Sequence, residues 1–476
     1  MKSIFVASEV GTLKRLLIHS PDSGLGKVVP SKAQDWLFED IVHLDTMRRD
    51  EYDYYVKILL YFLDPEKIRG RIAAIDADAS RAFYKPDHPE YFNSSRVIEF
   101  QKLLADILED ELVRTKLVAA ICAVEHEWYT TQSELGELAP VELAKTLISG
   151  TTPSGEMLFA PVPNFIFTRD IGITINDHLL LNKPAKQART REALLAQYIF
   201  YNHPVFADIR GKIIELPDNE LYFLLPDNEK DYNKTTLEGG DVMMVAPNHL
   251  LVGVSERTTV FAAQQTIKVL FDREVVDKIT VVKIPFKRDY MHLDTIFTQV
   301  KRDVWVVLGS LARTGRHTDD QIDATMSGLI PPRADEEVKI VQFFKGENRP
   351  KEIESLEELL IQISVEDLGC RRDKVRFIYS GNNEFPYGAR EQWTDSCNLL
   401  ALKEGVVIGY DRNDKTLEAF RQAGFRTVRA ADLLQEFENG QSDPGTLTDT
   451  FVMLPSAELS RARGGSHCMS MPLHRE

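Results

Sequence analysis

The sequence has few features of secreted or membrane proteins. Only four of its 476 residues are cysteines, and none belongs to a CxxC pair, which favours free thiols in a reducing compartment over a disulfide framework. No stretch approaches 18 consecutive apolar residues, so we expect no membrane partner. The N-terminus is typical of an ordinary strand rather than a signal peptide. We therefore predict a cytoplasmic protein.

An excess of positive charge is also missing. The chain has 57 Lys and Arg against 73 Asp and Glu, a formal net charge of −16. Phosphate backbones require a basic surface, so this balance argues against a nucleic-acid partner. An acidic field could attract a small cationic substrate, although most acidic proteins are simply ordinary cytoplasmic ones. With 43% apolar and 27% charged residues, the chain can bury a sizeable core.

The common signatures of metal and nucleotide sites are missing as well. We find no HExxH, no Walker A motif, no Rossmann glycine pattern and no zinc spacing. Cys468, with only His467 and His474 nearby, makes a poor metal set, so we predict neither a metal nor a cofactor. A thiol, a histidine and carboxylates widely separated in sequence remain, which is typical of a nucleophilic site that the fold assembles.

The chain is organised as a mixed α/β protein. Apolar runs typical of strands recur along it: Leu16–Ile18, Phe165–Phe167, Leu250–Val254, Val304–Leu308 and Val406–Tyr410. Two of them are followed by amphipathic stretches, "TTVFAAQQTIKVLF" and "DKTLEAFRQAGF", which indicates a weakly repeated strand–helix module.

Residues from about 45 to 149 have a different pattern. Apolar residues at helical spacing predominate, and "APVELAKTLISG" opens with Pro140 and closes on Gly150, as helix ends prefer. Because no Ser/Gly linker or low-complexity tract separates this segment from the rest, we predict one domain over residues 1–476 with a helix-rich insertion at about 45–149.

Two acidic segments lie in strand-like surroundings. In "PNFIFTRDIGITI", a period of two puts Asn164 and Asp170 on the same face, although Asp170 alone could equally be a turn residue. In "TLEGGDVMMV", two glycines between Glu238 and Asp241 let the backbone bend and approach another group closely. A hairpin turn would also explain these glycines.

A third segment, "MHLDTIFTQV", combines a base with an acid. The same period of two places His292 and Asp294 on one face, which makes them better candidates for acid–base chemistry than a lone histidine would be.

These segments carry a family resemblance. "PNFIFTRD", "LEGGD", "MHLDTIFT", "REQW", "GVVIGYDRN" and "ARGGSHCMSMP" occur in the order found in arginine deiminases, and the resemblance covers nearly the whole chain. That family belongs to the guanidine-modifying enzymes. The resemblance implies a five-bladed pseudo-symmetric α/β propeller of repeated ββαβ modules with an α-helical insertion. It also implies the hydrolysis of L-arginine to L-citrulline and ammonia.

The resemblance also implies a catalytic set of one thiol, one imidazole and three carboxylates: Cys468, His292, Glu238, Asp170 and Asp294. Cys468 matches the nucleophile that forms a covalent S-alkylthiouronium intermediate, and His292 matches the general acid and base. Glu238 matches the residue that contacts the guanidinium and orients His292. The two aspartates match the guanidinium ligands, which suits a planar cation with five N–H donors. Asp241 matches a supporting residue behind them.

Other positions match substrate-binding residues of the family. Asn164, Arg189 and Arg257 correspond to the residues that hold the substrate α-carboxylate. Arg463 matches a mobile arginine at the site entrance, and Leu37 matches a residue whose backbone contacts the substrate. From the residues alone, each arginine would be interpreted as part of a surface salt bridge.

The chain departs from the family pattern in several places. Ala462 and Asn382 stand where glycine is usual, Cys397 stands where small or polar residues are common, and the stretch 311–357 is longer. Alternative functions on the same fold are an amidinotransferase or a dihydrolase. From a different class, a catalytically weak arginine-binding regulatory protein is another alternative. The family resemblance also implies a homo-oligomer.

Overall fold

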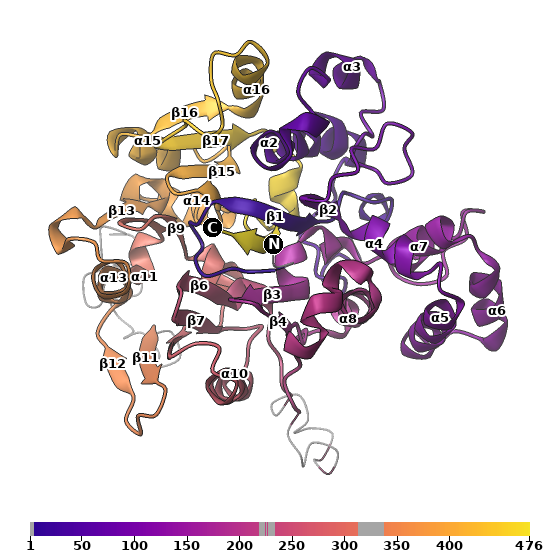
Figure 1. The fold of residues 1–476 in the computed structure, drawn as a ribbon, viewed down its shortest axis with the longest axis horizontal. Helices are drawn as coiled ribbons and strands as arrows, with labels where there is room; N and C mark the ends of the chain where they lie inside the picture. Colours follow the sequence, from indigo (N-terminus) through magenta and orange to yellow (C-terminus); the bar gives the residue numbers. More distant parts are fainter. Residues whose placement is uncertain (1–3, 219–223, 225, 227–233, 313–337) are drawn as a thin grey trace.

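The computed structural model describes residues 4–218, 224, 226, 234–312 and 338–476. Within these residues the strands form five separate sheets, which lie around the middle of the molecule in Figure 1. Most of the longer segment noted at 311–357, namely 313–337, lies outside the described residues. No described helix has the length and apolar character needed to cross a bilayer.

Four of the sheets begin with two consecutive antiparallel strands. These pairs are β3 (Gly172–Ile175) with β4 (His178–Leu181), β6 (Val242–Ala246) with β7 (His249–Val254), β9 (Phe297–Lys301) with β10 (Val304–Val307), and β14 (Leu400–Lys403) with β15 (Val406–Tyr410). The predicted strands at Leu250–Val254, Val304–Leu308 and Val406–Tyr410 are thereby confirmed within a residue or two. Strand β7 is buried at every position, so its sequence is a nearly continuous apolar run rather than an alternating one.

In each of these four sheets the second strand then gains a parallel partner after at least one helix, as parallel pairing requires. The helix and its strand are α8 (Thr190–Asn202) with β5 (Ile213–Ile214), α10 (Val260–Asp272) with β8 (Lys278–Lys283), α13 (Leu356–Gln362) with β13 (Arg376–Tyr379), and α15 (Asp414–Gln422) with α16 (Ala430–Glu438) before β17 (Thr450–Leu454). Three further strands extend two of these sheets: β11 (Lys339–Phe344), β12 (Lys351–Ile353) and β16 (Arg426–Arg429).

The fifth sheet joins the two ends of the chain. Strand β18 (Met471–Arg475) pairs antiparallel with β1 (Leu13–Ile18), and β1 pairs parallel with β2 (Val97–Glu99). Both chain ends consequently lie near the middle of the molecule in Figure 1.

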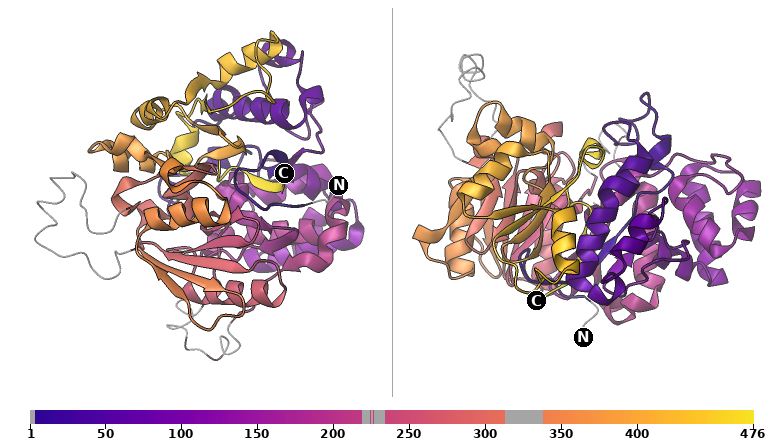
Figure 2. Two further views of the ribbon diagram at one scale, coloured as in Figure 1. Left: turned by 60° about the vertical axis from the view of Figure 1, so that its left-hand side comes forward. Right: turned by 90° about the horizontal axis from the view of Figure 1, so that it is seen from above.

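Between residues 44 and 149 the chain is mainly helical. The helices are α1 (Leu44–Thr46), α2 (Asp53–Leu63), α3 (Ile72–Ala77), α4 (Phe100–Ile107), α5 (Glu111–Glu125), α6 (Tyr129–Glu137) and α7 (Pro140–Ser149). The predicted ends of α7 are confirmed, because Pro140 opens it and Gly150 ends it with a φ of 72°. Side chains of α2 join the core of the C-terminal sheet, whereas α4, α5 and α7 pack with α8. Figure 2 shows this part on one side of the sheets.

The polar segments are not strands, contrary to the period-two interpretation. Phe165–Phe167 lies across two 3₁₀ turns, η4 (Pro163–Ile166) and η5 (Thr168–Ile171). The "EGGD" and "HLD" segments form η10 (Gly239–Asp241) and η12 (Leu293–Thr295). Strand pairing begins only after each turn, because the turns direct their polar side chains inward, toward one another.

Candidate active site

The candidate residues come together because each lies just before a strand of one of the sheets. Asp170 lies directly before β3, Asp241 before β6, and Asp294 shortly before β9. Cys468 precedes β18, which begins at Met471. Four segments that are far apart in the sequence therefore place their side chains around one centre.

One cavity collects most of the predicted residues. It is lined by Leu37, Asn164, Asp170, Arg189, Arg257, His292, Arg463 and Cys468, together with Phe167, Met291, Thr295 and Ala462. Its volume is about 20 Å³, which is room for about one water molecule. Glu238, Asp241 and Asp294 contact the lining residues from behind. An amino acid would fit only after some of these side chains move.

The thiol of Cys468 is buried among acids. Its Sγ lies 3.5 Å from Oδ2 of Asp294, and its backbone N–H donates to Oδ1 of Asn398 at 3.0 Å. Burial, followed by the negative charges of Asp294 and Asp170, raises the pKa of the thiol well above its usual value. Cys468 is therefore a protonated thiol in this state, with Asp294 as the acceptor.

His292 and Glu238 form a buried charged pair. Nε2 of His292 lies 2.9 Å from Oε2 of Glu238. Burial alone would lower the pKa of His292, but Asp170 and the hydrogen bond to Glu238 raise it to about 10. Burial likewise opposes ionisation of Glu238, but Arg189 and His292 hold the pKa of that carboxyl well below its usual range. His292 is thus an imidazolium beside a carboxylate.

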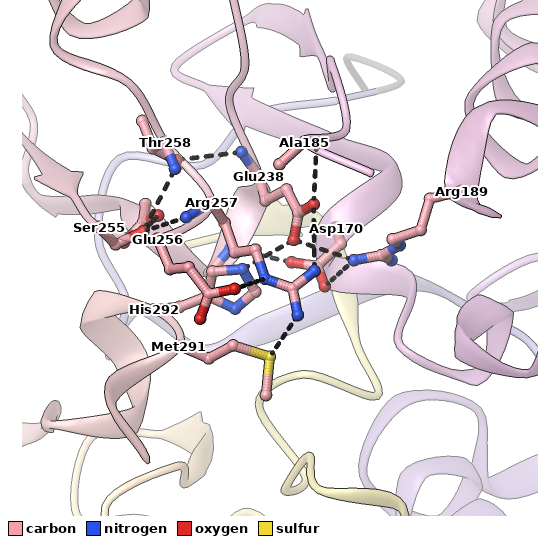
Figure 3. Close-up of polar contacts among 12 residues, drawn as sticks. Asp170, Ala185, Arg189, Glu238, Ser255, Glu256, Arg257, Thr258, Met291 and His292 are labelled. Carbon is pink, nitrogen blue, oxygen red and sulfur yellow. Dashed lines mark hydrogen bonds and ion pairs between the residues drawn. The ribbon is translucent and has the colours of Figure 1, made fainter. Parts of the chain in front are cut away.

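The guanidinium of Arg189 bridges the carboxylates of Glu238 and Asp170 (Figure 3). Its Nη1 is 2.8 Å from Oδ2 of Asp170 and 3.1 Å from Oε2 of Glu238, while its Nε is 2.9 Å from Glu192. The predicted contact of Arg189 with a substrate carboxylate stays a prediction. In this structure the side chain occupies the space between two of the acids predicted to bind a guanidinium.

The same acids have the spacing of metal ligands. One ligand atom each from Asp170, Glu238 and His292 lies within 4.8 Å of the others. However, Nη1 of Arg189 donates to both carboxylates, and the ring of His292 is engaged by Glu238. These contacts fit an organic cation held by charge-assisted hydrogen bonds.

The glycines of "EGGD" are explained by close packing. A Cβ on Gly240 would lie 2.6 Å from Nδ1 of His292, so only glycine allows the imidazole to approach the turn. Asp241 supports the next turn, because its Oδ1 accepts the N–H of Leu293 at 2.9 Å and its Oδ2 accepts the hydroxyl of Ser255 at 2.6 Å. Neither glycine serves a hairpin turn.

The other two predicted arginines line the cavity with different partners. Nη2 of Arg257 lies 3.4 Å from the sulfur of Met291, and its Nη1 is 3.9 Å from Glu238. Arg463 stacks on Trp393, with 3.5 Å between the guanidinium carbon and the ring centre. The left-handed residue of the loop is Arg463, with a φ of 58°, and Ala462 has no positive φ. Alanine at position 462 is therefore not strained.

Two other departures from the family pattern are also accommodated. Asn382 has a φ of 54°, a conformation that asparagine tolerates better than most residues. Cys397 is fully buried, and burial raises the pKa of its thiol to about 12, which makes it an unreactive core residue.

Sequence reasoning missed the residues that hold Asp294 and Cys468 in place. His467 bridges two acids, with Nδ1 2.8 Å from Asp294 and Nε2 3.2 Å from Glu9. Asn398 donates to the carbonyl of Asp294 at 3.3 Å and accepts from the backbone of Cys468. The only sequence feature near Asn398 was the family motif "REQW", which precedes it. No motif marked Glu9, because its partner, His467, lies 458 residues away.

Comparison with known families identifies the family of this chain. The model of the family described as arginine deiminase matches residues 100–475. The chain belongs to the arginine deiminase family. It is accordingly an enzyme, and the arginine deiminase of Treponema denticola is 28% identical over 485 residues, covering 100% of this chain and 99% of that protein.

Solved structures of other guanidine-modifying enzymes have lower sequence identity to this chain. An amidinotransferase from Microseira wollei is 11% identical, with 100% of this chain and 98% of that chain covered and a TM-score of 0.43. A dimethylarginine dimethylaminohydrolase from Pseudomonas aeruginosa is 15% identical, with 65% and 76% covered and a TM-score of 0.34.

Proposed function

We propose that this protein hydrolyses L-arginine to L-citrulline and ammonia, with Cys468 as the nucleophile. The observation that carries the proposal is the meeting of one thiol and one imidazolium at a cavity bounded by carboxylates. A thiol can attack a guanidinium carbon, and an imidazolium can protonate the amine that leaves. The surrounding acids supply the negative charge that a guanidinium requires.

Arg189 supports the binding part of this proposal. Its own guanidinium lies against Asp170 and Glu238 at hydrogen-bond distances, so these acids accept the chemical group in question. Substrate binding would move Arg189 out of this position. Once released, Arg189 could join Arg257 and Asn164 at the cavity wall to hold the α-carboxylate of the substrate.

In the first step the substrate guanidinium takes the place of Arg189 and lies against Asp170 and Asp294. Its positive charge lowers the pKa of the Cys468 thiol, which passes its proton to Oδ2 of Asp294 as Sγ bonds to the guanidinium carbon. One carbon–nitrogen bond then breaks. His292 gives its proton to the departing nitrogen, and ammonia leaves an S-alkylthiouronium on Cys468.

In the second step water replaces sulfur. His292, now neutral, takes a proton from water, and the resulting hydroxide attacks the thiouronium carbon. The carbon–sulfur bond breaks, and Asp294 returns its proton to the Cys468 thiolate. The product gives up its hydroxyl proton to solvent and leaves as citrulline. Glu238 holds the His292 ring throughout, which makes it a positioning residue as well as a guanidinium ligand.

The proposed architecture follows the same family. We propose that the five sheets are the blades of a pseudo-symmetric propeller, with residues 1–476 forming one domain and about 45–149 forming an insertion. The support is the strand order: an antiparallel pair followed by a helix and a parallel strand occurs in four sheets, and the chain ends complete the fifth. The homo-oligomer and the cytoplasmic location also stay predictions.

One assay tests the proposed reaction. Purified protein incubated with arginine is expected to release citrulline and ammonia in equal amounts, and Cys468→Ala is expected to abolish this release. Rapid acid quenching followed by intact-mass measurement should find a protein adduct equal to arginine minus ammonia. Ornithine would instead indicate a dihydrolase or, with an amine acceptor, an amidinotransferase. Arginine binding without turnover would indicate a regulatory protein.

A further inference from the structure

A second and larger cavity lies in the helical part of the chain. Its volume is about 600 Å³, within the usual range for sites that bind small organic ligands. Its walls come from the start of the helical segment, from the loop at 79–89, from Gln101 of α4 and from the end of α7. None of the predicted active-site residues lines it.

The charges in its wall are unbalanced. Four cations and three carboxylates line the cavity: Arg48, Arg49, Lys85 and Lys145, with Asp22, Asp45 and Asp87. Lys145 pairs with Asp87 at 2.8 Å, and Asp22 is engaged by His19 at 3.2 Å. Arg48, Arg49 and Lys85 form no ion pair within the described part of the chain, although Lys85 lies within reach of the negative charges of Asp22, Glu99 and Asp87.

Arg48 and Lys85 are held in place by backbone groups rather than by acids. Nε of Arg48 donates to the carbonyl of Pro21 at 2.9 Å, and Nζ of Lys85 donates to the carbonyls of Ser20 and Pro21. These bonds fix both side chains without neutralising them. Burial, and then the nearby charge of Arg48, lower the pKa of Lys85 to about 7 against the opposing charges of Asp22, Glu99 and Asp87, and a bound anion would raise it.

A second feature of the wall indicates a ligand. The side chain of Gln101 is 3% exposed, and its Nε2 has no hydrogen-bond partner among the described residues. A buried amide that donates to nothing is costly, and buried polar groups in native proteins are nearly always satisfied. An acceptor in the cavity would satisfy this donor.

We propose that this cavity binds a small organic phosphate, with Arg48, Arg49 and Lys85 around the phosphoryl group and Gln101 as a further donor. A phosphoryl group carries a charge between −1.5 and −2 and three strong acceptor oxygens, which suits a wall that has one more cation than carboxylates. The guanidinium fork suits such oxygens through paired hydrogen bonds. Ala82, Tyr84 and Ile148 offer apolar wall to the organic part.

Calorimetric titration of the full-length protein tests this site, with AMP and inorganic phosphate as the probes. We expect AMP to bind more tightly than inorganic phosphate, because only AMP fills the cavity. Arg48→Gln and Lys85→Gln should each weaken binding of both probes by about tenfold or more, since each removes a charge-assisted hydrogen bond. Arg114→Gln on α5, outside the cavity, makes the same change in net charge and should leave binding unaltered.

Thermal melting shows whether the variants fold. Arg49→Gln provides a second test, because Arg49 is exposed and its side chain makes no recorded hydrogen bond. If AMP does not bind, or if these variants bind it as the unaltered protein does, the site is wrong. Equal affinity for inorganic phosphate and AMP would contradict the proposal that the ligand has an organic part.

Discussion

The two histidines on either side of Cys468 are both buried and both contact carboxylates, but they are held differently. His292 lines the cavity and has one ring nitrogen bonded to Glu238. His467 lies outside the lining and has both nitrogens against acids, Asp294 and Glu9. A ring held at one nitrogen can exchange a proton at the other. A ring held at both can only fix its neighbours.

This difference in hydrogen bonding distinguishes the role of His292 from that of His467, which their distance from Cys468 along the sequence does not. His467 is adjacent to Cys468 in sequence, whereas His292 is 176 residues away. Proximity in sequence alone would point to His467 as the base, whereas the family resemblance matches His292 to that role, and the hydrogen bonds favour His292 as well. Since imidazole acts by proton transfer only where a nitrogen faces the reactants, we assign His467 to positioning Asp294.

The same substitution at both histidines tests this assignment, and the larger effect on turnover is expected at His292. His292→Gln should lower kcat for arginine by roughly 10²–10⁴-fold, the usual range for a lost acid–base group. Steady-state citrulline formation measures it, and arginine binding by calorimetry should change much less. Turnover close to that of the unaltered protein would reverse the roles.

His467→Gln should act mainly on stability and KM. Glutamine can donate through one end only, so either Asp294 or Glu9 loses its partner, at a cost of about 1–3 kcal/mol. Thermal melting and the split between KM and kcat measure the effect. If kcat falls as far as in His292→Gln while KM is unchanged, His467 takes part in proton transfer.

The pH dependence of stability gives a third test. The pKa of His292 is raised to about 10 in the folded protein, against roughly 6.5 in an unfolded chain. Its contribution is therefore complete below about pH 6.5 and is lost as pH rises through about 10. Denaturant unfolding at pH values between about 6.5 and 10 should show that stability falls with rising pH, and that it falls less steeply in His292→Gln than in the unaltered protein. If only His467→Gln made the fall of stability with pH shallower, the group that titrates here would be His467 and not His292.

Much of the fold was predictable where several apolar residues stand together. The runs that became β7, β10 and β15 are long and buried, so hydrophobicity alone located them. "PNFIFTRD" and "MHLDT" mix polar with apolar residues, and their alternation resembles that of a strand. Their backbones turn instead, since Asp170 and Asp294 are stabilised by contacts with distant segments that periodicity does not record.

The candidate site was predictable in its members but less so in its contacts. The resemblance of short motifs to a family located Cys468, His292 and the acids, and the structure places them together. It did not predict that Arg189 would lie between Asp170 and Glu238. That contact depends on which of several nearby acids the side chain of Arg189 reaches in the absence of substrate, and this is decided only in the folded protein.

The position of Arg189 has a consequence for how substrate and product would exchange. The protein carries an internal competitor, so the observed affinity for arginine would equal the intrinsic affinity multiplied by the fraction of molecules in which Arg189 has moved away. Citrulline has a neutral ureido group and would compete poorly with a cation for Asp170 and Glu238. As the charge of the substrate disappears during the proposed reaction, the return of Arg189 would help to expel the product.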